Sequence, residues 1–102
     1  MKDAIRARIK EIQEKIREVT ELIYQNREQR MYQEIDQLLQ LLMDLDTFTA
    51  EASRQGESLP FGREELKQVL IEAMEAMEQK DMILFADILQ DGLGELFRQA
   101  LE

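Results

Sequence analysis

Carboxylates are the abundant reactive side chains in this sequence, which contains 22 Asp and Glu residues but no His and no Cys. Carboxylate-bridged metal centres in helical bundles pair glutamates with histidines, and that arrangement cannot be built without His. Zinc sites made from Cys or His, thiol nucleophiles and disulfides are excluded for the same compositional reason. We therefore expect no metal ion and no cofactor.

The pair Asp44 and Asp46 is the nearest approach to a cation site, close to the end of a predicted helix. The twelve-residue calcium loop with its central Gly and terminal Glu is missing, so a solvated helix end is the simpler interpretation. The Ser and Thr residues have no general base beside them, and Gly92-Leu93-Gly94 lacks the strand that precedes a nucleotide-binding loop. We expect no catalytic residues and infer that the chain is not an enzyme.

The charge is unevenly distributed along the chain, whose net charge is −9. Residues 1–30 carry eight Lys and Arg against six Asp and Glu, whereas residues 31–102 carry five against sixteen. A nucleic-acid-binding protein needs a basic patch, so nucleic acid is not an expected partner. Two interpretations stay open: the first helix packs its basic flank against the acidic remainder, or the acidic face attracts a basic partner.

Apolar residues at heptad spacing predict two long helices. The first series is Ile5, Ile9, Ile12, Ile16, Val19 and Ile23. The second is Met31, Ile35, Leu38, Leu42 and Leu45. The two series are out of phase across residues 25–30, where Asn26 tolerates a left-handed conformation. This predicts a hairpin of helices over about 3–25 and 29–52, the alternative being one continuous helix with a stutter.

The second half of the sequence predicts another pair of helices. Residues 53–62 form a loop that contains the single Pro and two of the four Gly. A helix over about 63–79 follows, with Gly62 at its N-cap and a hydrophobic staple between Phe61 and Leu66. Asp81 caps a last helix over 82–101. We expect one all-α domain over residues 1–102, an up-down antiparallel four-helix bundle made of two helical hairpins.

The last helix is apolar over more than half of its circumference, and seven of the eight residues 82–89 are apolar. A helix in a bundle needs about three apolar positions in seven, so the surplus predicts an interface with a second copy or a partner. The candidate interface consists of Met82, Ile83, Leu84, Phe85, Asp87 and Ile88. Asp87 fits either a structural contact with a basic residue of the first helix or a binding groove.

The six Met residues have two interpretations. Met at helical spacing commonly fills irregular gaps in a core. It is also common on surfaces that adapt to varied helical partners. Both interpretations stay open from the sequence.

The segment from Glu75 to Leu89 resembles small helical proteins of unassigned function from Gram-positive bacteria. Those proteins pair a helical hairpin with a C-terminal segment of the form Ala-Leu-x-x-x-Asp-x-x-x-x-Ala-Asp-Leu-Leu, which Asp81, Ala86, Asp87 and Leu89 match. The resemblance extends over residues 75–93 and implies a helical bundle without an assigned activity. Size, charge and helicity are also similar to those of small acidic chaperones of bacterial protein export, although no motif supports that likeness.

These observations favour a non-enzymatic protein-interaction module: an adaptor, a regulator or an export chaperone that holds an amphipathic partner helix. We also expect a homodimer. The alternatives are a purely structural homo-oligomer and, less favoured, a carboxylate-based metal-binding protein or enzyme. No stretch of eighteen apolar residues and no export signal are visible, so we expect no membrane association and a cytoplasmic location.

Overall fold

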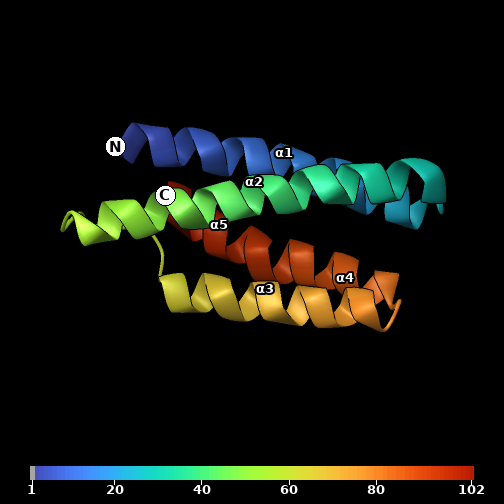
Figure 1. Ribbon diagram of the computed structural model, residues 1–102. Helices are drawn as coiled ribbons and strands as arrows, with labels where there is room; N and C mark the ends of the chain where they lie inside the picture. The colour runs from blue at the N-terminus through green and yellow to red at the C-terminus, as the bar shows by residue number, and fades with distance from the viewer. Residues whose placement is uncertain (1) are drawn as a thin grey trace.

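The computed structural model describes residues 2–102, and the regular elements in that range are all helices. Their order and bounds are α1 (Lys2–Tyr24), α2 (Glu28–Arg54), α3 (Arg63–Glu78), α4 (Met82–Asp87), the π-helix η1 (Ile88–Leu93) and α5 (Gly94–Leu101). The predicted all-α class is therefore confirmed. Figure 1 shows α1 beside α2, and α3 beside the rod formed by α4, η1 and α5.

The break between the two heptad series is a tight turn. α1 ends at Tyr24 and α2 begins at Glu28, with Asn26 in the left-handed region at a φ of 57°. The backbone N–H of Arg27 donates to the carbonyl of Leu22 at 3.1 Å, which closes the end of α1. The chain therefore turns back on itself here and is not one continuous helix.

The core is built on the two heptad series, and all eleven of their residues are buried. α1 packs along α2 and also contacts α4, η1 and α5. An exposed series would need a second copy of the chain to cover it. The structure shows that both series are covered within one chain, so they do not require a dimer.

The loop between α2 and α3 is fastened to the core by an aromatic contact. Gly56 adopts a φ of 82° just after α2, a conformation that favours Gly. Phe61 is buried and meets Phe97 of α5 edge to face, with ring centroids 6.0 Å apart and planes at 73°. Leu66, the staple partner of Phe61, is also buried. This loop brings α3 back over the bundle.

The final rod begins as the sequence predicts but is not one uniform α-helix. Asp81 caps α4 by accepting a hydrogen bond from the backbone N–H of Leu84 at 3.1 Å. The π-helix η1 then separates α4 from α5, which corrects the expectation of a single α-helix over 82–101. A π-helix has wider turns than an α-helix and is characteristically short.

The π-helix matches the spacing of the largest fully buried side chains of the rod, which are Phe85, Leu89, Leu93 and Phe97. They follow one another at intervals of four. In an α-helix each such step rotates the side chain by about 40°, so three steps would turn it by about 120° away from the core. The wider π turns keep all four side chains on the buried face.

Two glycines of the rod predict opposite responses to the same substitution. A Cβ on Gly92 would lie 2.9 Å from Val69 Cγ1, whereas a Cβ on Gly94 would meet the carbonyl oxygen of Leu89 at an ordinary 3.6 Å. We expect Gly92→Ala to lower the free energy of unfolding by about 1 kcal/mol, because overpacking outweighs the gain in helix propensity. Gly94→Ala should raise it by up to about 1 kcal/mol. Chemical denaturation of both variants checks this, and equal effects would contradict the close approach at Gly92.

One ion pair joins the first two helices. Lys15 Nζ donates to Glu34 Oε2 at 2.6 Å and also reaches Glu18 Oε2 at 3.1 Å. The hydrogen bond from Lys15 lowers the pKa of Glu34, while partial burial acts in the opposite direction. The same bond raises the pKa of Lys15. The basic flank of α1 thus meets the acidic remainder at this pair.

This pair predicts a modest acid-dependent loss of stability. The depressed pKa of Glu34 means that its contribution is present above about pH 4.5, the ordinary glutamate value, and is lost as the pH falls through its folded-state pKa. We expect Glu34→Gln to lower the free energy of unfolding by up to about 1 kcal/mol at pH 7. Urea denaturation at pH 7 and pH 3 checks this, because the difference from wild type should shrink at pH 3. A constant difference would contradict the assignment.

Candidate functional site

Large apolar side chains are exposed on α1, α2, α3 and α4. The exposed set is Tyr24, Tyr32, Met43, Ile71, Met74, Ile83 and Leu84. Ile83 and Leu84 belong to the predicted interface on α4, whereas Met43 lies on α2 and both Ile71 and Met74 lie on α3. Clustered apolar exposure of this kind is characteristic of binding surfaces.

The predicted interface on α4 is divided between the surface and the core. Ile83 and Leu84 are 56% and 43% exposed, and Asp87 is exposed as well. Met82 and Ile88 are half-buried against the core. Phe85 is fully buried, so it belongs to the core and not to an interface. Because Phe85 is two positions after Ile83, it points about 200° around the helix from it.

Asp87 contacts the first helix through a tyrosine and not through a basic residue. The hydroxyl of Tyr24 lies 3.4 Å from Asp87 Oδ1 and 3.3 Å from Gln90 Oε1, and it can donate to one of them at a time. Partial desolvation, followed by the negative charge of Asp87, raises the pKa of Tyr24. This is a structural contact between α1 and the final rod.

A second surface, which the sequence interpretation missed, is the α2–α3 groove. It has a volume of about 330 Å³. Its lining residues are Met43, Asp46 and Thr47 of α2 and Arg63, Glu64, Lys67 and Leu70 of α3. α2 and α3 approach each other less closely than α1 approaches α2 or α3 approaches α4, which leaves room for this hollow.

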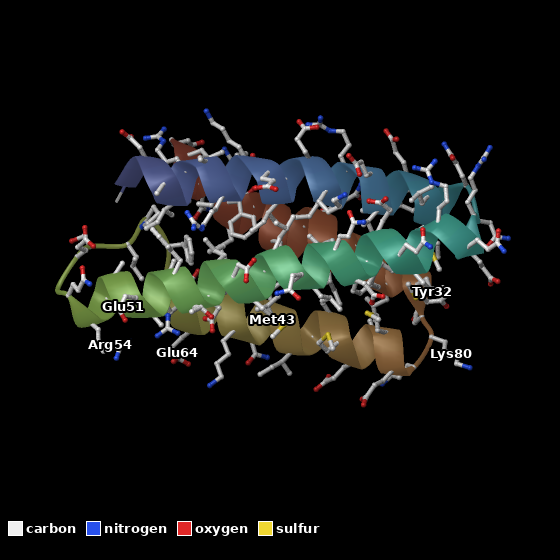
Figure 2. The ribbon with its side chains drawn as sticks, turned by 45° about the horizontal axis from the view of Figure 1, so that its top comes forward. Tyr32, Met43, Glu51, Arg54, Glu64 and Lys80 are labelled. Carbon is white, nitrogen blue, oxygen red and sulfur yellow. The ribbon has the colours of Figure 1, made fainter. Side chains whose placement is uncertain are left out.

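The apolar lining of the groove consists of Met43 on α2 and Leu70 on α3. Met43 is 64% exposed, the highest value among the large apolar residues, and Figure 2 shows it at the border between α2 and α3. Leu39 precedes Met43 by one helical turn, and Met74 follows Leu70 by one turn. Helical spacing therefore extends the apolar surface along both walls. Flexible thioether side chains suit a surface that adapts to its partner.

The lining of the groove contains an ion pair. Arg63 Nη2 lies 3.2 Å from Asp46 Oδ1, while Asp44 Oδ1 accepts a hydrogen bond from Gln40 Nε2 at 3.4 Å. Asp44 and Asp46 thus have separate partners and do not form one site. Within residues 2–102, no three acidic residues are grouped closely enough to hold a metal ion.

Comparison with known protein families assigns the sequence to one of them. Residues 3–102 match the family described as "Domain of unknown function (DUF8042)". The chain belongs to this family. The DUF8042 match covers all the helices, a wider range than residues 75–93, where the resemblance to a family of unassigned function is found. No curated protein and no solved structure matches the chain.

The described methionines of this DUF8042 domain divide between the core and the surface. Met31 is buried, Met77 and Met82 are half-buried, and Met43 and Met74 are exposed. The signal that could have found the groove is a second apolar row beside the heptad series, formed by Leu39 and Met43 and repeated by Leu70 and Met74. In residues 2–102 no helix is both long enough and apolar enough to cross a membrane.

Proposed function

We propose that this chain is a non-enzymatic protein-interaction module that acts as an adaptor, a regulator or an export chaperone. The observation that carries the proposal is the α2–α3 groove, where the lining residue Met43 is 64% exposed. Met74, which is 46% exposed, lies one turn beyond the lining residue Leu70 on α3. An apolar groove between two helices suits a partner that presents the apolar face of an amphipathic helix.

The proposed scaffold is an up-down antiparallel four-helix bundle made of two helical hairpins. The short turns at residues 25–27 and 79–81 support it, because each one joins helices that lie side by side. Such a bundle presents long parallel walls on its surface, and the α2–α3 groove lies between two of them. A cytoplasmic location and an origin in Gram-positive bacteria stay predictions from the sequence.

A dye-binding experiment tests the proposal. We expect the folded wild-type chain to raise the fluorescence of an apolar-surface dye, and the double variant Met43→Gln/Met74→Gln to remove most of that increase. Gln matches Met in length and helix propensity, so the variant should stay folded. The matched control is Ile83→Gln/Leu84→Gln, which changes two exposed residues outside the groove. Equal dye binding by wild type and by the groove variant would contradict the proposal.

The alternative is a purely structural homo-oligomer, favoured by the adjacent exposed residues Ile83 and Leu84 on α4. If it is correct, wild type should sediment as a dimer without dye binding, and Ile83→Lys or Leu84→Lys should yield a folded monomer. Wild type that sediments as a monomer across a wide concentration range would eliminate this alternative. A rise in Tm on adding divalent cations would instead favour a metal-binding protein.

A further inference from the structure

We infer that the α2–α3 groove binds a cationic amphipathic helix of a partner protein. This inference rests on the proposed function and adds the chemical class of the partner. Two observations carry it: the apolar groove and the charge of the two helices that form its walls.

α2 and α3, the two helices that form the groove, together carry a net charge of −7 out of the −9 of the chain. α2 carries six acidic and two basic residues, and α3 carries five acidic and two basic residues. α1, by contrast, carries five acidic and six basic residues. The net negative charge of the two helices favours a positively charged partner over a negatively charged one.

Several carboxylates beside the apolar row have no internal partner. Glu75 and Glu78 flank Met74, the latter one turn further along α3, and Asp36 lies about one turn before Leu39 on α2. None of the ion pairs formed by described side chains involves these three carboxylates. They are free to pair with basic residues that flank the apolar face of a bound helix.

The same charges disfavour the other occupants of an apolar groove. A second copy would bring one acidic face against another, and like charges placed across an interface repel each other. Nucleic acid and anionic membranes are repelled in the same way. The lining itself is balanced, with Arg63 and Lys67 against Asp46 and Glu64. The surplus negative charge comes from the carboxylates further along the two helices. A helix fits better than an extended segment, because the apolar residues of both walls repeat at one-turn spacing along the groove.

Three peptides of about sixteen residues test the inference. Each has leucines at positions i, i+3, i+4 and i+7 of a helix, and its remaining positions are Lys, Gln or Glu. Binding to the full chain is measured by calorimetry at low salt. We expect the Lys peptide to bind at least tenfold more tightly than the Gln peptide, and the Glu peptide not to bind. Salt at 0.15 M should weaken the Lys peptide by shortening the Debye length to about 8 Å.

Two matched pairs of variants locate the site. Met43→Gln/Met74→Gln should weaken the Lys peptide at least tenfold, whereas the control Ile83→Gln/Leu84→Gln should change its affinity less than twofold. Glu75→Gln/Glu78→Gln should weaken it by about threefold to tenfold at low salt. The control Glu11→Gln/Glu21→Gln removes two exposed carboxylates from α1 and should have a smaller effect. Circular dichroism shows that each variant is folded.

The other outcomes overturn the inference in distinguishable ways. Equal binding of all three peptides, weakened by the methionine variant, would refute the partner's charge and leave the proposed function standing. Lys-peptide binding that the methionine variant does not change would show general charge attraction without the groove. A wild-type dimer that the same variant separates would show that a second copy covers the groove. If no peptide binds, the inference fails, and dye binding alone decides the proposed function.

Discussion

Leu42→Asp is expected to lower Tm by about 20 °C or more, the largest effect among our predictions. Leu42 is 2% exposed in the seam where α2 packs along α1. A carboxylate there has no partner, and burying it costs roughly 4 kcal/mol or more in addition to the lost apolar contacts. A domain of this size has a total stability of about 5–15 kcal/mol, so little cooperative folding should remain.

The neighbouring residue provides the matched control for this substitution. Met43 is 64% exposed, so Met43→Asp introduces the same carboxylate into the same helix without burying it. It should cost less than about 1 kcal/mol, mainly through helix propensity. Thermal melts followed by circular dichroism compare the two variants. Similar melting temperatures would mean that α2 presents a different face to α1 from the one described.

The second large effect is expected from Phe85→Ala, which should lower the free energy of unfolding by about 4 kcal/mol. Phe85 is among the largest fully buried side chains and lies in the first turn of the rod that contacts α1 and α3. Its removal would leave a cavity that the surrounding helices can close only in part. Urea denaturation at neutral pH measures the loss.

Leu84→Ala is the control for Phe85→Ala. Leu84 is 43% exposed, and its truncation should cost less than about 1 kcal/mol. A binding role for Phe85, as the sequence suggested, would instead leave stability unchanged and weaken association. Sedimentation measures association and urea denaturation measures stability, so the two together distinguish a core role for Phe85 from a binding role.

The first hairpin could be predicted from the sequence because the residues that determine its helices and its turn lie close together along the chain. Six apolar residues spaced alternately by four and three define the buried face of α1, and a phase change together with Asn26 locates the turn. The caps are equally local: Asp81 accepts the backbone hydrogen bond that its position before an apolar run implies. Residue spacing and capping chemistry were sufficient in these regions.

The apolar rows on α2 and α3 are visible in the sequence, but their meeting in one groove and the placement of Phe85 could not be predicted, because both depend on how helices are rotated and separated in space. An apolar count over residues 82–89 gives the number of surplus apolar side chains but not which of them face outward. Likewise, Met43 and Met74 come from helices far apart in sequence. The separation of α2 from α3 is a property of the whole bundle and leaves no local mark.

The π-helix has a consequence for comparing this chain with its relatives. The four largest buried side chains of the rod are spaced by four, four and four residues. Deleting one residue between Leu89 and Leu93 would change this spacing to four, three and four, which is the alternating spacing of the apolar residues in α1. An ordinary α-helix can bury that pattern, so both flanking segments would keep their faces toward the core. We therefore expect that a relative can lack one residue within 88–93 without a change of fold, and that an alignment gap for such a relative belongs in this helix.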